Sequence, residues 1–158
     1  MVLKPLIRFI EHLPKDGNIE LAILKCHLLI EELLFKIISN EAKNSKYIEN
    51  ANLTFSQKMY LARAFSQLQD EIWLWNAIKK LNDTRNKLAH GLSPEEITSK
   101  CNSFIELVEK AKGRPEKDLL GPTFNRFHWA AFNVFSALSA YANHPLYKLK
   151  MPTLLTGK

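Results

Sequence analysis

The chain has 158 residues, of which 46% are hydrophobic and 24% are charged. These proportions exclude an intrinsically disordered chain and, with the length, predict a single domain over residues 1–158 with a hydrophobic core of its own. The formal net charge of +6 and the pI of about 9.3 favour anionic partners such as nucleic acid, although many other globular proteins share this charge.

The positions of proline and glycine predict an all-α helical bundle of about five to six helices. Neither residue occurs between Gly17 and Gly91, and so long a segment without helix breakers is typical of all-α proteins. A short first helix is predicted over 4–12 and a second over 18–42. The second helix has apolar residues at spacings of three and four, which mark its buried face: Ile19, Ile23, Cys26, Ile30, Leu33 and Ile37.

A polar stretch over 43–53 is predicted to be a loop. Thr54 or Ser56 follows it, and either residue can accept a hydrogen bond from the free N–H groups of a helix that begins there. We expect this third helix to run to about Leu68.

The fourth helix is predicted from about Asp70 to His90. Gly91 comes directly after it and is suited to the left-handed conformation that commonly ends a helix.

The fifth helix begins with a capping-box pattern and is expected to run to about Lys112. Ser93 stands at the N-cap, Pro94 at the first helical position and Glu96 at the third. After a connection, a last helix over 123–142 is rich in aromatic residues, which we expect to lie in the core or in a dimer interface.

No targeting or membrane segment is evident in the sequence. Charged residues interrupt the only apolar run near the N-terminus, and no stretch reaches the roughly 20 apolar residues of a membrane span. Cys26 and Cys101 are not spaced as metal ligands, and two cysteines do not make a disulfide framework. We therefore expect a cytoplasmic protein that needs no metal and no cofactor and does not associate with a membrane.

Arg85 interrupts the apolar face of the fourth predicted helix. At 100° per residue it falls in the middle of a band, roughly 80° wide, that otherwise contains only Leu and Ile. Arginine is seldom buried without a partner, so Arg85 must either meet a carboxylate inside the bundle or open into a cleft. The opposite side of the helix is polar and carries Asp83, Asn86 and His90, of which the last two are four residues apart and can touch.

The second predicted helix offers an acidic partner for Arg85. Glu31 shares a stripe with apolar residues and with His27, one turn before it, and is expected to point inward. Glu32 lies on a stripe with lysines and is expected at the surface, paired with a lysine. We therefore expect Arg85 and Glu31 to interact.

These polar residues also have a structural interpretation. Arg85 and Glu31 can form a buried ion pair that has no other role. His90 can interact favourably with the negative end of the helix dipole, and His27 can be a core histidine with satisfied hydrogen bonds. Spacing alone leaves both interpretations open.

The stretch "TRNKLAHG", at the end of a helix in a small all-α bundle, resembles the Rx4–6H motif of the HEPN superfamily, the higher-eukaryote and prokaryote nucleotide-binding domains. Arg85 and His90 match the two defining positions, and Asn86 matches the polar residue that usually follows the arginine. The resemblance extends more loosely over 17–112, where Glu31 is similar to the acidic residue that the family carries on an earlier helix.

The resemblance implies a metal-independent endoribonuclease, which could act as a toxin or a defence component under the control of an antitoxin. In such a protein Arg85, His90 and Asn86 would be the catalytic residues, and Glu31, His27 and Asp83 would support them. RNA would be cleaved by attack of its own 2′-hydroxyl, in a site that two protomers of a homodimer form together. Histidine is suited to move the proton, and arginine to stabilise the phosphate charge.

Two other interpretations remain open. The stretches "FSQKMYLARAF" and "WLWNAIKKLNDTRNKLAHGLSPEEI" also resemble the mannitol-repressor branch of HEPN-like proteins. That branch implies a non-catalytic regulator that binds protein or nucleic acid. The chain could also be a structural helical domain whose RxxxxH string is accidental.

Overall fold

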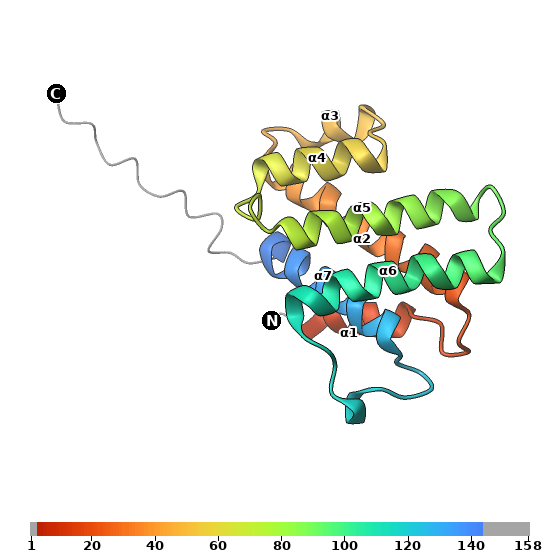
Figure 1. Ribbon diagram of the computed structural model, residues 1–158. Coiled ribbons are helices and arrows are strands. Elements are labelled where there is room, and N and C mark those ends of the chain that lie inside the picture. Colours follow the sequence, from red (N-terminus) through yellow and green to blue (C-terminus); the bar gives the residue numbers. More distant parts are fainter. Residues whose placement is uncertain (1–2, 144–158) are drawn as a thin grey trace.

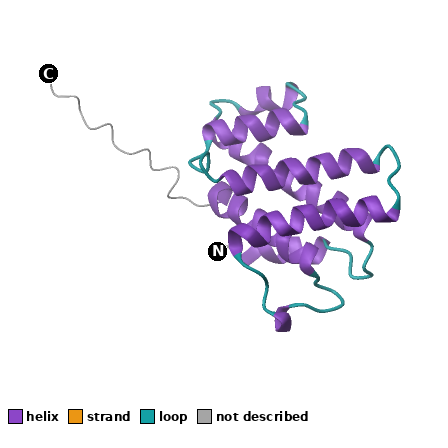
Figure 2. Ribbon diagram, in the orientation of Figure 1, coloured by secondary structure: helices purple, strands orange, loops and turns teal. Residues whose placement is uncertain are grey.

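The computed structural model describes residues 3–143, which are all-α and contain no β-strand (Figures 1 and 2). This confirms the predicted fold class. The described chain has one α-helix more than the upper bound of the prediction, together with one short 3-10 helix. The elements are α1 (Leu3–His12), α2 (Ile19–Glu41), α3 (Ser45–Asn50), α4 (Phe55–Phe65), α5 (Ile72–Leu88), α6 (Pro94–Lys112), η1 (Lys117–Leu119) and α7 (Arg126–Asn143).

The second helix, α2, is the central element of the bundle and packs against α1, α4, α5 and α7. Asn18 caps its first turn, and the side-chain oxygen of Asn18 accepts a hydrogen bond from the Leu21 amide at 3.0 Å. The predicted apolar stripe is buried apart from Ile19, which is partly buried. Within residues 3–143, no helix is both long and apolar enough to cross a bilayer.

The fifth and sixth helices, α5 and α6, form an antiparallel hairpin with a short connection (Figure 1). The α-helix ends at Leu88, earlier than predicted. The last turn tightens, because the His90 amide donates to the carbonyl oxygen of Lys87 at 3.0 Å. Gly91 then takes a φ of +78°, as its position predicts. The capping box of Ser93 and Glu96 is present at the start of α6.

The short helix α3 lies in the segment that was predicted to be a loop. None of its six residues is buried, so it has no apolar stripe from which periodicity could have identified it. Asn44 caps it by accepting a hydrogen bond from the Lys46 amide at 3.1 Å. The next prediction is more accurate, because Thr54 caps α4 in a complete capping box with Gln57.

The last helix, α7, packs into the core, where Phe127, Phe135 and Tyr141 are buried. It begins at Arg126, later than predicted. The Arg126 guanidinium donates two hydrogen bonds, of 2.7 and 2.8 Å, to the buried carboxylate of Glu109 on α6. This bidentate pair holds the start of α7 against α6 and lowers the pKa of Glu109.

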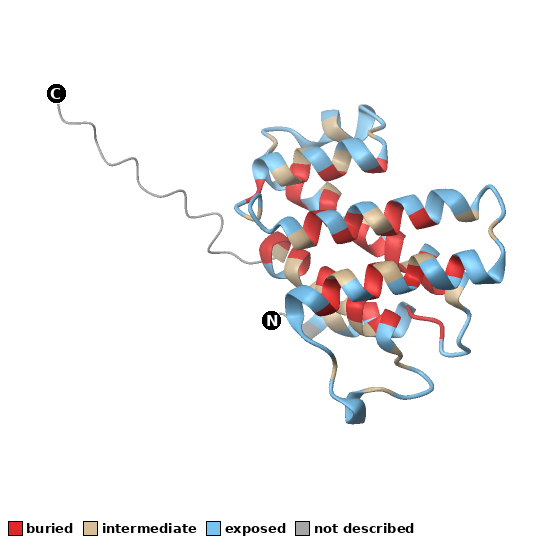
Figure 3. Ribbon diagram, in the orientation of Figure 1, coloured by how far each residue is buried: buried red, intermediate tan, exposed pale blue. Residues whose placement is uncertain are grey.

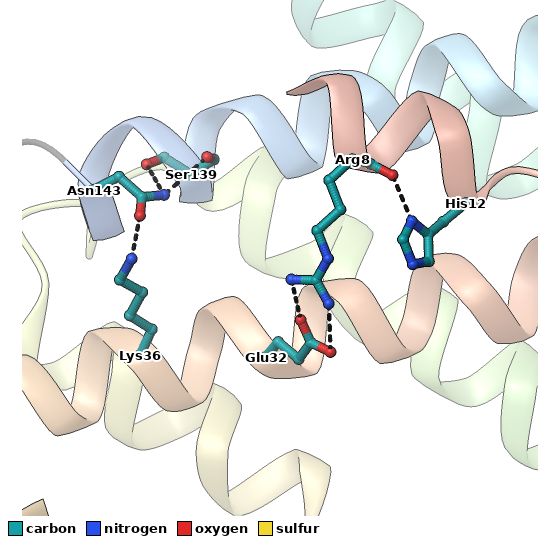
Figure 4. Close-up of polar contacts among 6 residues, drawn as sticks. All are labelled: Arg8, His12, Glu32, Lys36, Ser139 and Asn143. Carbon is teal, nitrogen blue, oxygen red and sulfur yellow. Dashed lines mark hydrogen bonds and ion pairs between the residues drawn. The ribbon is translucent and has the colours of Figure 1, made fainter. Parts of the chain in front are cut away.

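Polar contacts tie the first and last described helices, α1 and α7, to α2 (Figure 4). Arg8 on α1 pairs with Glu32 through both carboxylate oxygens, at 2.8 and 3.1 Å. Lys36 donates a hydrogen bond to Asn143 at the end of α7, and the Asn143 amide donates to Ser139. Glu32 is exposed as predicted, but the prediction of a lysine partner is wrong because α1 brings Arg8 to it.

Candidate functional site

Arg85 lies at the surface and not inside the bundle. Its apolar neighbours on the same stripe, Leu74, Ile78 and Leu81, are buried, but the stripe leaves the core toward the end of α5 (Figure 3). Leu88, at the end of the stripe, is only partly buried. Of the two alternatives that the sequence offered for Arg85, the structure therefore shows a guanidinium open to solvent.

Arg85, Asn86 and His90 are all exposed at the C-terminal end of α5. The guanidinium donates a hydrogen bond from Nη1 to the Asn86 side-chain oxygen at 3.3 Å. No carboxylate within residues 3–143 forms an ion pair with Arg85, and no hydrogen bond joins Arg85 to His90. The three side chains thus keep most of their hydrogen-bonding capacity for another molecule.

Glu31 pairs with Lys58 of α4 and not with Arg85. The Lys58 ammonium lies 2.8 Å from Oε1 of Glu31, and both side chains are partly buried. The predicted Arg85–Glu31 pair is therefore wrong. The sequence could not show that α4, 27 positions further along, places a closer cation beside Glu31.

His27 is buried between α4 and α5. Its Nε2 forms a hydrogen bond with the Asn82 side-chain oxygen at 2.9 Å, and its ring stacks on Phe55 with centroids 4.1 Å apart. Burial lowers the pKa of His27 and outweighs the hydrogen bond to Asn82 and the charge of Glu31, which raise it. His27 is thus a neutral core histidine with a satisfied hydrogen bond.

Asp83 lies on a different side of α5 from Arg85. It lines a hollow between α5 and α6 that we call the α5–α6 groove. This groove has a volume of about 400 Å³. Its lining is polar throughout and comes from one face of each helix: Lys80, Asp83, Thr84, Asn86, Lys87, Ser99, Lys100 and Ser103. Asn86 therefore belongs both to the groove and to the exposed set at the end of α5.

The described residues contain no group of three or more His, Cys, Asp or Glu side chains placed to bind a metal ion. Both cysteines are buried thiols. Burial raises the pKa of Cys101 to about 11 and raises that of Cys26 further. The two thiols are therefore protonated at neutral pH and poorly suited to nucleophilic chemistry.

Sequence reasoning missed Asn82 and Lys58, which partner the predicted residues His27 and Glu31. Asn82 follows Leu81 at the edge of the apolar band of α5, and that position is the one available signal for it. Lys58 follows the cap of α4 without any distinguishing pattern. No protein-family model, curated protein or solved structure matches this chain.

Proposed function

We propose that this protein is an endoribonuclease of HEPN type that cleaves RNA without a metal ion, with Arg85 and His90 at the reacting phosphate. The observation that carries the proposal is the common exposure of Arg85, Asn86 and His90 at one end of α5. An arginine without a carboxylate partner keeps its paired donors for a phosphate. This exposure removes the main structural alternative, in which Arg85 is sealed in an ion pair.

The reaction requires one base, one acid and a cation. A neutral histidine takes the proton from the RNA 2′-hydroxyl, whose oxygen attacks the adjacent phosphorus. The bond from phosphorus to the 5′-oxygen breaks, and this oxygen receives a proton from an acid. The products are a 2′,3′-cyclic phosphate and a 5′-hydroxyl. His90 suits the base, Arg85 stabilises the charge on the phosphate oxygens, and Asn86 positions the Arg85 guanidinium.

The second proton-transferring group is expected from a second copy of the chain, because each copy carries one histidine at this end of α5. A two-fold homodimer would bring two sets of Arg85 and His90 together. An exposed apolar stripe on α2 could form the interface of such a dimer. Its residues Leu21, Leu24 and Leu28 are 36%, 40% and 58% exposed. His27 of α2 forms a hydrogen bond with Asn82, one turn before Asn86 on α5, so the part of α2 that carries the stripe packs beside the last turns of α5.

The same leucine stripe favours a second candidate, a non-catalytic HEPN-like regulator resembling the mannitol repressor. In that case α2 would bind a regulatory protein, and the exposed Arg85 would bind nucleic acid without cleaving it. An antitoxin or another regulatory partner of the nuclease would use the same apolar surface. The two candidates differ in whether RNA is cut.

The test is cleavage of RNA by the purified protein in the presence of EDTA. The proposal predicts fragments that end in a 2′,3′-cyclic phosphate and a 5′-hydroxyl. A matched RNA with 2′-O-methyl groups must remain intact, because it lacks the attacking hydroxyl. Binding of both RNAs without cleavage of either, across varied sequences, would favour the regulator.

A further inference from the structure

The α5–α6 groove carries an excess of positive charge. Three of its lining residues are lysines, Lys80, Lys87 and Lys100, against the single carboxylate of Asp83. No carboxylate within the described chain lies within ion-pair distance of these lysines. Lys80 donates instead to the Ser103 hydroxyl at 2.8 Å. The groove thus holds three ammonium groups that form no ion pair with any described carboxylate.

Two of these lysines, Lys87 on α5 and Lys100 on α6, line the groove from opposite helices. The Lys87 side chain on α5 lies close enough to that of Lys100 on α6 to lower the pKa of Lys100. The negative charges of Glu96 and Asp83 raise the pKa of Lys100 and so act in the opposite direction. Facing cations repel one another unless an anion lies between them, so this arrangement suits a bound anionic group.

The spacing of the lysines indicates a ligand with several charges. Lys80 and Lys87 are seven residues apart on one helix, which is about 10 Å along the helix axis. A single phosphate is too small to contact both, whereas a chain of consecutive phosphates can. Beside the lysines the groove presents the exposed hydroxyl of Ser99, which can hydrogen-bond to a ribose 2′-hydroxyl. The Thr84 hydroxyl is buried and donates to the carbonyl oxygen of Lys80 at 2.8 Å.

The groove is continuous with the exposed end of α5. Asn86 lines the groove and also accepts the hydrogen bond from Arg85. A second hollow of about 660 Å³ adjoins the groove on α6, shares Ser99 and Ser103 with it, and carries the carboxylates of Glu95 and Glu106. Those carboxylates repel phosphate, so a bound polyanion favours the α5–α6 groove over this second hollow.

We propose that the α5–α6 groove binds the sugar–phosphate backbone of single-stranded RNA and leads it to Arg85 and His90. This inference rests on the proposed function for its substrate, but the groove can bind RNA whether or not the chain cleaves it. Lys87 and Lys100 clamp one phosphate, Lys80 contacts a phosphate further along the strand, and Asn86 stands where the groove meets the cleavage site.

The test compares RNA binding by two matched double variants on a His90→Ala background, which prevents cleavage. Lys87→Gln/Lys100→Gln removes the clamp. Lys43→Gln/Lys46→Gln removes the same charge from exposed positions outside the groove. The probe is a fluorescent single-stranded RNA of about twelve nucleotides, titrated at several salt concentrations.

The groove proposal predicts that the clamp variant binds at least about tenfold more weakly, while the control stays within about twofold of its parent. The slope of log affinity against log salt should fall by about 0.7 in the clamp variant, since the two lysines share one phosphate and each phosphate contact on a single strand contributes about 0.7. Equal affinities of the clamp variant and its parent would overturn the proposal, as would a parent that does not bind RNA.

The groove proposal and the nuclease proposal can be rejected independently. Groove-dependent binding by a wild-type protein that cuts no RNA would keep the groove and reject the nuclease. Cleavage by the wild type, together with clamp-variant binding equal to that of the parent, would keep the nuclease and reject the groove.

Discussion

His27 of α2 and Asn82 of α5 are joined by a buried hydrogen bond of 2.9 Å between the ring Nε2 and the amide oxygen. The Asn82 amide nitrogen in turn lies 3.4 Å from the Ser56 hydroxyl on α4. Three helices therefore meet at one polar contact beneath the exposed end of α5. The His27 ring is neutral here, because burial lowers its pKa.

Stability should fall in mild acid because of this histidine. The unfolded chain binds the His27 proton more readily than the folded protein, so the free energy of unfolding decreases as the pH drops below about 6.5. His27→Gln should show a smaller decrease between about pH 7.5 and 5.5 in urea denaturation. A decrease remains, since burial also lowers the pKa of His128. The control is His12→Gln, which removes an exposed histidine and should show the same pH-dependent decrease in unfolding free energy as the wild type. A decrease in His27→Gln as large as that of the wild type would contradict the role given to His27.

The partner of Glu31 can be tested by double-mutant cycles of unfolding free energy. Glu31→Gln and Lys58→Met should show a coupling of about 0.5–1 kcal/mol, since their ion pair is only partly shielded from solvent. The matched cycle of Glu31→Gln with Arg85→Gln should show a coupling near zero. Coupling in the second cycle equal to that in the first would restore a direct link between Glu31 and Arg85.

These residues show how far the sequence predicts the fold and the site. Helix caps and apolar stripes are local, so Thr54 and Ser93 mark their helix starts correctly. The apolar stripe around Arg85 left two alternatives, a carboxylate partner inside the bundle or an opening into a cleft. Periodicity does not show that this stripe leaves the core before the end of α5. The partners Lys58 and Arg8 come from other helices, and their positions depend on the tertiary packing of the bundle.

The α5–α6 groove illustrates the same limit. Its lysines come from two helices, and neither helix has an unusual charge pattern when it is read alone. The hairpin that brings Lys87 and Lys100 together depends on the left-handed turn at Gly91 and the cap at Ser93. Both signals can be read from the sequence. Which residues of α6 then face Lys87 across the hairpin cannot, because it depends on how the two helices pack.

Both thiols should resist modification in the folded protein. With the pKa of Cys101 raised to about 11, the thiolate fraction at pH 8 is about 100-fold below that of a free cysteine. Reaction with a chromogenic disulfide should therefore be slow for both cysteines and fast after addition of denaturant. Cys101→Ser isolates the signal of Cys26. A rapid phase in the native protein would show that one thiol is accessible.

Removal of the one carboxylate in the α5–α6 groove should strengthen RNA binding. On the His90→Ala background, Asp83→Asn should increase affinity by about twofold to threefold, because it removes repulsion without changing side-chain size. Glu49→Gln, an exposed site on α3, is the charge-matched control. Weaker binding by Asp83→Asn would instead mean that Asp83 orients a lysine.

The most direct test of the central claim is the rate of RNA cleavage in EDTA by wild type, His90→Ala and Arg85→Ala. All three proteins should have equal stability, because both side chains are exposed. The account predicts that each substitution lowers the rate by at least about 100-fold. Cleavage by His90→Ala or Arg85→Ala at the wild-type rate would contradict the assignment of these residues to the reaction.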